Sequence, residues 1–184
     1  MTPPSDFATG EGPASFRTTP AELLFVCLGN ICRSPLAEGV FLHLVRDAGL
    51  ESSLDADSAG TGGWHAGEPP DPRSVEVARR HGIELRGPAR QVQREDFDRF
   101  ALILAMDRDN QEELRRRRPA VATRGRILLL REFDSEAGQD LDVPDPYYGG
   151  PSGFDQVFEM VHRSCVGLLR HLHGPSQEQP PESQ

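Results

Sequence analysis

The chain has 184 residues with 36% hydrophobic content, which is enough for one domain with one core, and its three cysteines, an odd count, argue against a disulfide framework. The net charge of −9 argues against nucleic acid as a partner, and no apolar run approaches the ~20 residues of a membrane span. All 20 basic residues are arginine, which excludes a Walker-type nucleotide loop and a lysine Schiff base.

Two segments at the ends of the chain differ in composition from the rest. Residues 1–20 and 175–184 are rich in proline and in small or polar residues, and they show no apolar periodicity. We expect both to be disordered tails that flank one domain over residues 21–174. The first twenty residues also lack the charged start and the apolar stretch of a secretory signal, so we expect a cytoplasmic protein.

The first predicted elements surround the sequence LLFVCLGNICRSP, residues 23–35. Residues 23–26 form an apolar run that is typical of a strand in a parallel sheet covered on both faces. Ser34 and Pro35 suit the N-cap and the first position of a helix, and apolar residues at helical spacing follow them. The predicted layout is therefore a strand, a tight loop and a helix.

The loop of this unit, residues 27–33, has the composition of an anion-binding site. Backbone N–H groups in such a loop can converge on one point, and the following helix adds the positive end of its dipole. Gly29 leaves room for a ligand near the backbone, Asn30 tolerates a left-handed conformation, and the planar guanidinium of Arg33 matches two phosphate oxygens. These groups should favour the thiolate form of Cys27, so we expect a nucleophile at the base of a phosphate cradle. The alternative is a structural cysteine, because Cys-x5-Arg alone also occurs by chance.

Later apolar runs predict a parallel sheet with helices on both faces. The alternation of elements implies a single-domain α/β fold with a four-stranded parallel sheet, similar to flavodoxin or Rossmann-like three-layer proteins. In such sheets ligands bind beyond the carboxyl ends of the strands, and Cys27 falls at one of them. Besides the first unit, strands are expected over residues 54–58, 100–106 and 127–130, and helices over residues 71–81, 108–117 and 152–173, the last with Ser152 and Asp155 as a capping pair.

A long polar loop with many carboxylates follows the last strand, over residues 132–155. Asp145 lies in it between two prolines that restrict the backbone, which suits a positioned acid, and Tyr147 and Tyr148 come next. A divalent-metal site is the alternative, but the loop lacks the glycine and the closing glutamate of an EF-hand loop. We therefore expect no metal.

Three further residues need an interpretation, and two of them, Trp64 and His81, permit more than one. Trp64 lies in a glycine-rich loop, where it could form a stacking wall beside the site or pack the loop onto the body of the protein. His81 could be a general base, but a lone histidine at a helix end is more often structural. Cys165 falls within the apolar stripe of the last helix, so we expect a core thiol.

The run VCLGNICRSP resembles the active-site signature of the low-molecular-weight protein tyrosine phosphatases almost letter for letter, and the resemblance extends from about residue 23 to residue 173. It implies a cysteine-dependent hydrolase of phosphotyrosine and aryl phosphates that needs no cofactor and no metal. Its partners would be phosphotyrosine-containing proteins, not nucleic acid or a membrane, and it would be a monomer or self-associate weakly.

The same resemblance assigns a role to each residue of the site. Cys27 would be the nucleophile, Arg33 and the loop amides, including those of Gly29 and Cys32, would bind the phosphate, and Asp145 would be the general acid. Ser34 would donate to the thiolate. The walls that grip the substrate ring would be Leu28, Ile31, Trp64, Tyr147 and Tyr148, and the loop would be braced by Asn30, Ser58 and His81. Cys32 is also close enough in sequence to form a reversible disulfide with Cys27 under oxidation.

Three other functions compete with this interpretation. Thiol-dependent arsenate reductases share the fold but need further redox cysteines, and residues 82–164 contain none. A phosphotyrosine-binding module would not need Cys27, Arg33 and Asp145 together. Bacterial phosphoarginine phosphatases have threonine at the position of Ile31, so the apolar side chain here favours a flat ring over a guanidinium.

Overall fold

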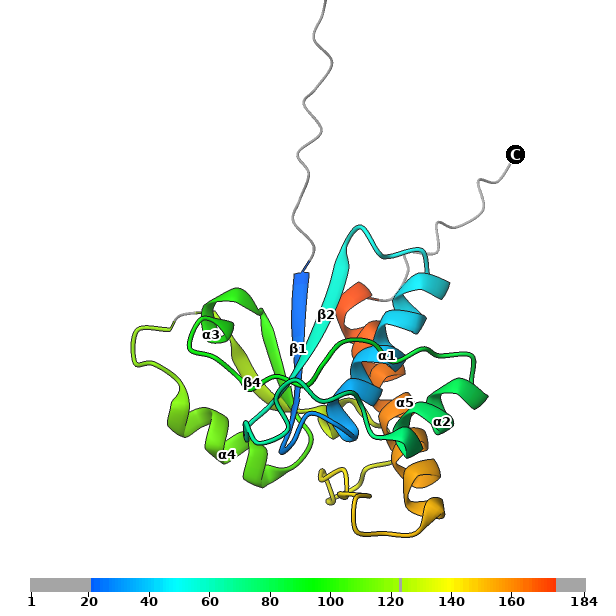
Figure 1. Cartoon of the computed structure of the whole chain (residues 1–184). Helices are drawn as coiled ribbons and strands as arrows, with labels where there is room; N and C mark the ends of the chain where they lie inside the picture. The colour runs from blue at the N-terminus through cyan, green and yellow to red at the C-terminus, as the bar shows by residue number, and fades with distance from the viewer. Residues whose placement is uncertain (1–20, 123, 175–184) are drawn as a thin grey trace, which may run out of the picture.

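A four-stranded parallel sheet forms the centre of the molecule, as expected. The computed structural model describes residues 21–122 and 124–174, and both expected tails lie outside the described residues. The strands lie in the order β2-β1-β3-β4 (Figure 1). They are β1 (Ala21–Cys27), β2 (Leu54–Gly60), β3 (Leu102–Ala105) and β4 (Arg126–Leu129).

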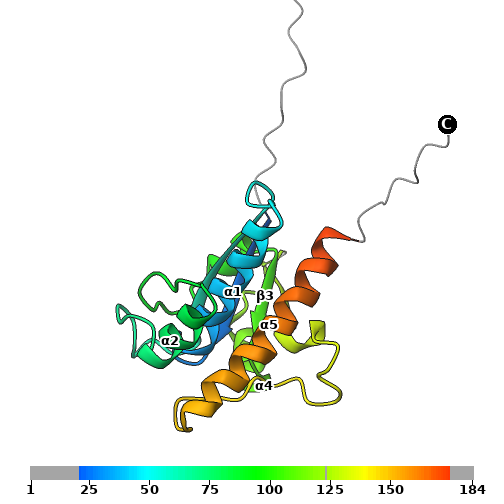
Figure 2. The same ribbon diagram turned by 90° about the vertical axis from the view of Figure 1, so that its right-hand side faces the viewer.

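Helices cover both faces of the sheet, which confirms the three-layer arrangement (Figure 1). On one face α1 (Arg33–Asp47) contacts β1 and β2, and the long α5 (Pro151–His173) runs beside it (Figure 2). The shorter α2 (Pro72–Arg80) packs against both of these helices. On the other face α4 (Arg108–Arg117) contacts β3 and β4.

The unbroken apolar run of β1 follows from its central place between two cores. Leu23, Phe25 and Cys27 belong to the cluster under α1 and α5. Leu24 and Val26 alternate with them and belong to the cluster on the opposite face. Because both faces of residues 23–27 are buried, this part of the strand has only apolar side chains and the Cys27 thiol, while Glu22 at the partly buried start pairs with Arg99.

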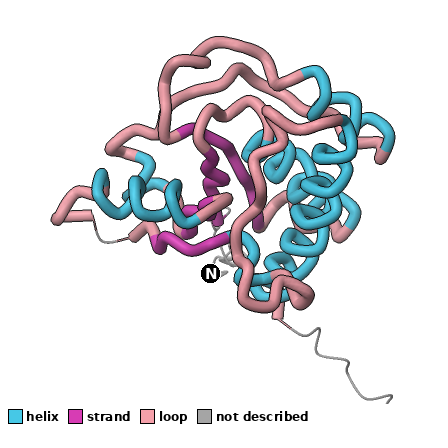
Figure 3. The backbone as a smooth tube through the Cα atoms, turned by 90° about the horizontal axis from the view of Figure 1, so that it is seen from below, coloured by secondary structure: helices cyan, strands magenta, loops and turns pink. Residues whose placement is uncertain are grey.

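The loops that follow the strands meet at one edge of the sheet. Cys27 at the end of β1 pairs with Gly60 at the end of β2, and Val26 pairs with Ala105 at the end of β3. Seen from below, loops cross this edge (Figure 3). The backbone N–H of Val143 donates to the carbonyl of Met106 at 2.7 Å, which attaches the acidic loop to the same edge. This edge therefore brings the loop that begins at Cys27 close to the acidic loop that carries Asp145.

Several helix ends differ from the expected ones. The N-cap of α1 is Cys32, so Ser34 lies in the first turn and its hydroxyl is available for other contacts. The N-cap of α5 is Gly150 without a side-chain bond, and Asp155 pairs with Arg80 at 2.5 Å instead of forming a capping pair.

Two short elements were not expected at all, the helix α3 (Asp96–Arg99) and the 3-10 helix η1 (Leu130–Phe133). Both have four residues, too few for a visible apolar period. Within the part of the chain that the structure describes, no helix is both long and apolar enough to cross a membrane.

Candidate active site

Cys27 ends β1 as a buried thiol with two polar contacts. Its Sγ accepts the backbone N–H of Asn30 at 3.3 Å and lies 3.1 Å from Ser34 Oγ. Asn30 has a φ of 56°, which confirms the expected left-handed conformation. The loop therefore curls so that its own backbone returns to the sulfur.

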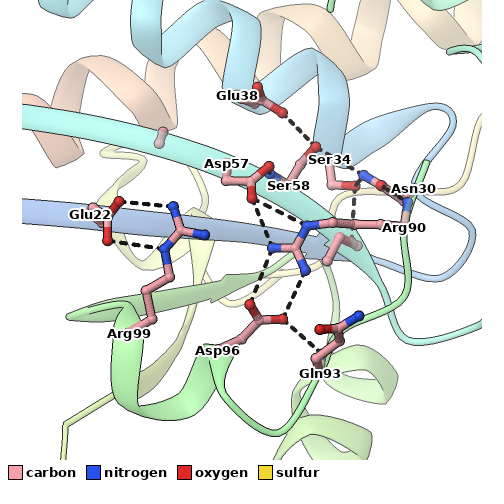
Figure 4. A network of polar contacts seen from close by, with 12 residues as sticks. Glu22, Asn30, Ser34, Glu38, Asp57, Ser58, Arg90, Gln93, Asp96 and Arg99 are labelled. Atoms are coloured by element: carbon pink, nitrogen blue, oxygen red, sulfur yellow. Dashed lines mark hydrogen bonds and ion pairs between the residues drawn. The ribbon is translucent and has the colours of Figure 1, made fainter. Parts of the chain in front are cut away.

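A network of side chains behind the loop fixes the direction of these hydrogen bonds (Figure 4). The backbone N–H of Arg90 donates to Asn30 Oδ1 at 2.8 Å, so the Asn30 amide nitrogen faces the other way. It donates to Ser34 Oγ and to Ser58 Oγ, each at 2.9 Å. Because Ser34 Oγ accepts this bond, its own proton is free for Cys27 Sγ or for the carbonyl of Ala59 at 3.3 Å.

The network ends on a carboxyl group that sequence reasoning missed. Ser58 Oγ donates to Glu38 Oε2 at 2.6 Å. Burial raises the pKa of Glu38 to about 7, although the bond from Ser58 acts in the opposite direction. Glu38 lies four residues after Ser34 in α1, and this spacing on one helix face is the signal that could have identified it.

The expected role of His81 as a brace is wrong. His81 is the C-cap of α2, and its ring stacks on Phe158 of α5 with the centroids 3.8 Å apart. Within the described residues the side-chain partners of Ser58 are Asn30 and Glu38. The His81 ring therefore packs on α5, and Glu38 is the residue that supports Ser58.

Arg33 is buried and holds three acceptors with its two terminal nitrogens. Nη1 donates to Asp107 Oδ2 at 2.5 Å and to the carbonyl of Val143 at 3.0 Å, and Nη2 donates to Asp145 Oδ2 at 3.1 Å. Burial alone would lower the pKa of Arg33, but the negative charges around the guanidinium raise it above its usual value. The group is therefore a fixed positive charge at the centre of the site.

Asp107 is a second site residue that the sequence prediction did not include. It follows β3 directly and caps α4, where its side chain accepts the backbone N–H of Asn110 at 2.7 Å. The signal was its place after the strongest apolar run of the chain, since residues at the carboxyl ends of parallel strands converge. Its other oxygen sets the orientation of the Arg33 guanidinium.

Asp145 comes from the acidic loop and reaches the same point as Arg33. Its Oδ2 accepts from Arg33, and its Oδ1 accepts the backbone N–H of Tyr147 at 3.0 Å. The carboxyl is 39% exposed, so it remains accessible from the side on which a substrate would approach. The structure thus brings Cys27, Arg33 and Asp145 together.

These residues line a cavity of about 120 Å³ that opens between large apolar side chains. Its walls include exposed rings, with Trp64 66% and Tyr148 93% exposed, and the two tyrosine rings meet edge to face at 5.0 Å. A Cβ on Gly62 would clash with the Trp64 ring, so Trp64 both covers the loop and forms a wall. The lining residues are Cys27, Leu28, Gly29, Ile31, Cys32, Arg33, Trp64, His65, Asp145, Tyr147 and Tyr148.

Two residues of the lining add details that the sequence did not indicate. A Cβ on Gly29 would lie 3.0 Å from the His65 ring, so the glycine makes room for a neighbouring side chain as well as for the cavity. Burial raises the pKa of the Cys32 thiol to about 12. Cys27 and Cys32 are both free thiols, so their disulfide stays a prediction. Within the described ranges no cluster of three or more metal-binding side chains occurs.

The sequence matches the family described as "Low molecular weight phosphotyrosine protein phosphatase" over residues 22–178. This chain belongs to that family. A low molecular weight protein-tyrosine-phosphatase of Streptomyces coelicolor is 52% identical over 146 residues, which cover 79% of this chain and 89% of that protein. The expected family, and with it the class of cysteine-dependent protein phosphatases, is therefore confirmed.

Solved structures of the low molecular weight phosphatases share the fold described above. A protein tyrosine phosphatase from Entamoeba histolytica, with Hepes in its active site, has a TM-score of 0.78 at 39% identity and covers 83% of this chain and 96% of its own. A Drosophila protein described as an arginine phosphatase has a TM-score of 0.78 at 32% identity and covers 83% of this chain and 98% of its own. The choice of substrate must therefore be argued from the site itself.

Proposed function

We propose that this low molecular weight phosphatase hydrolyses phosphotyrosine and aryl phosphates through a phosphocysteine intermediate. One observation carries the proposal. A thiol, a guanidinium and an accessible carboxyl, those of Cys27, Arg33 and Asp145, line a single cavity whose walls are apolar and aromatic. The thiol, the guanidinium and the carboxyl can together perform phosphoryl transfer, and the apolar walls fit a flat ring.

In the first step the Cys27 thiolate attacks the phosphorus atom. A sulfur–phosphorus bond forms and the bond from phosphorus to the phenolic oxygen breaks. Asp145, in its acid form, gives its proton to the leaving oxygen. Arg33 and the amides of the loop bind the equatorial oxygens, where negative charge is held during the transfer.

In the second step Asp145, now a carboxylate, takes a proton from water, and the resulting oxygen attacks the phosphorus. The sulfur–phosphorus bond breaks, inorganic phosphate leaves and the thiolate is restored. Ser34 stabilises the departing sulfur, since its hydroxyl lies 3.1 Å from Sγ and receives its own hydrogen bond from Asn30.

Turnover of p-nitrophenyl phosphate by two substituted proteins tests this function. Cys27→Ser should lose turnover but retain inorganic phosphate binding, because the cradle consists mostly of backbone and Arg33. Arg33→Lys should lose both, because an ammonium cannot bind two oxygens side by side. Arg46→Lys, on the exposed part of α1, is the control and should behave as the wild type. Turnover by Cys27→Ser near the wild-type rate would refute the nucleophile.

Phosphoarginine is the second candidate substrate, because one of the similar structures is described as an arginine phosphatase. The side chain of Ile31 is 8% exposed in the cavity and offers no polar group. A guanidinium beside it would lose hydrogen bonds that water provides, whereas an aromatic ring would not. Phosphotyrosine is therefore the preferred substrate.

The remaining expectations on partners and location extend this proposal. The substrates are phosphoproteins, and the protein acts as a monomer or self-associates weakly. The cytoplasm is the proposed location, because a nucleophilic thiol beside a second cysteine needs a reducing compartment.

A further inference from the structure

We propose that Arg73 is a positioning residue that joins the acid loop, residues 143–150, to the nucleophile loop, residues 27–33. In this role it holds Asp145 in place for proton transfer. The inference rests on the proposed function, because it takes Asp145 to be the general acid.

The contacts of Arg73 with the acid loop are of two kinds. Its Nη1 donates to the carbonyl of Tyr147 at 3.2 Å. Its guanidinium also lies over the Tyr147 ring, 5.5 Å from the centroid, and over the Phe154 ring at 4.6 Å. The backbone N–H of Tyr147 in turn donates to Asp145 Oδ1 at 3.0 Å. Arg73 therefore fixes the residue that orients the carboxyl of Asp145.

On its other side Arg73 is fixed by Asp71. Nε donates to Asp71 Oδ1 at 3.0 Å and Nη2 donates to Oδ2 at 2.8 Å, in a two-pronged pair. The Asp71 carboxyl is nearly buried, at 8% exposed, so the pair is more than a surface contact. Asp71 also caps α2, and its side chain accepts the backbone N–H of Arg73 at 2.8 Å.

Asp71 continues this link to the nucleophile loop. Its backbone N–H donates to the carbonyl of Ile31 at 2.8 Å, and Ser74 Oγ donates to the carbonyl of Cys32 at 3.4 Å. A continuous path of hydrogen bonds thus leads from Ile31 through Asp71, Arg73 and Tyr147 to Asp145. It joins the two loops without passing through Arg33.

This second path matters because Arg33 has another task during the reaction. Here Arg33 Nη2 binds Asp145 Oδ2, but a phosphate that occupies the guanidinium fork competes for the same nitrogen. The acid loop would then keep its attachment at Val143 and the buried Pro146, while Tyr147 and Tyr148 at its tip are 39% and 93% exposed. The Arg73 contacts do not involve the phosphate, so they persist when substrate binds.

The test compares two substrates that differ in their need for an acid. Phenyl phosphate has a poor leaving group, and p-nitrophenyl phosphate has an activated one that departs without a proton. Arg73→Met removes the donors but keeps a side chain that packs on Phe154. We expect it to lower kcat/KM for phenyl phosphate roughly tenfold more than for p-nitrophenyl phosphate. The reason is that kcat/KM reports the steps up to departure of the leaving group, where only the poor leaving group needs the proton of Asp145. Arg73→Lys can still donate to Tyr147 and should show a smaller shift in the same direction.

Two controls separate this inference from the proposed function and from instability. Arg79→Met, also in α2, removes only an exposed pair with Glu76 and should keep the wild-type ratio of the two kcat/KM values. Asp145→Asn should shift that ratio further than Arg73→Met. A shift in Asp145→Asn without one in either Arg73 variant would overturn the role of Arg73 alone. The absence of a shift in Asp145→Asn would refute the general acid itself. A loss of kcat/KM that is equal for both substrates in Arg73→Met would mean a structural role only.

Discussion

Ile31 is the residue of the nucleophile loop whose side chain decides between two substrate chemistries. Ile31→Thr should shift the preference from a phosphotyrosyl toward a phosphoarginyl peptide, because a hydroxyl can pair with polar groups around a guanidinium phosphate. The measurement is the ratio of kcat/KM for the two peptides in competition. Ile83→Thr, at a buried position outside the cavity, is the control and should leave the ratio unchanged. If the wild type prefers the phosphoarginyl peptide, the substrate assignment is wrong although the mechanism survives.

Among single residues, the sequence predicted the chemical groups of the nucleophile loop well. It predicted less well the residues behind the loop that hold it in place. Asn30 could be predicted because its left-handed conformation is a local property of the chain. Its partners are not local: Ser58, on another strand, was expected only from the family resemblance, and the Arg90 backbone, on a distant loop, was not expected. His81 and Glu38 show the same limit, since the choice between them depends on where α2 ends relative to α1.

At the scale of elements, α5 approaches η1 through a glycine. A Cβ on Gly167 would clash with the carbonyl oxygen of Phe133, which belongs to η1 and cannot rotate away as a side chain could. We expect Gly167→Ala to lower the free energy of unfolding by about 1–3 kcal/mol. Urea denaturation measures this change.

Gly153 in the same helix provides a matched control. A Cβ there would meet Pro146 at 3.7 Å, an ordinary contact, so Gly153→Ala should be neutral or should stabilise by up to about 1 kcal/mol through helix propensity. Equal effects of the two substitutions would contradict the close approach of α5 to η1. This approach could not be predicted from the sequence, because η1 has only four residues and Gly167 interrupts no visible pattern.

On the scale of the whole molecule, Glu38 links stability to pH. Its pKa in the folded protein, raised from 4.5 to about 7 mainly by burial, means that the folded state binds a proton in this range that the unfolded state has lost. Stability from this group is therefore greatest below about pH 4.5 and falls as the pH rises to about 7. Glu38→Gln cannot titrate. Its Tm relative to that of the wild type should rise between about pH 5 and about pH 8.

Thermal unfolding at both pH values checks this expectation. Glu84→Gln, at an exposed glutamate paired with Arg86, is the control and should change Tm equally at both. If the difference in Tm between the wild type and Glu38→Gln is the same at both pH values, the buried carboxyl does not titrate as proposed.

The overall architecture was the part that the sequence predicted best. The apolar runs of β1 and β3 are buried on both faces, and this burial leaves a pattern that needs no knowledge of partners. Because parallel strands place their carboxyl ends together, the pattern also predicted a ligand site at the edge of the sheet where Cys27 lies. What it could not predict was the contact of Arg73 with Tyr147, which joins the two loops, since these residues lie 74 positions apart in the sequence.

The central claim is that the phosphoryl group is transferred to the Cys27 sulfur before water removes it. The most direct measurement is rapid quenching of the protein during turnover of p-nitrophenyl phosphate, followed by peptide mapping with mass spectrometry. The Asp145→Asn protein should be included, because slower hydrolysis lets the intermediate accumulate. The account predicts one phosphoryl group per molecule on the peptide that contains Cys27, and none in Cys27→Ser. A phosphoryl group on any other residue, or turnover by Cys27→Ser at the wild-type rate, would contradict it.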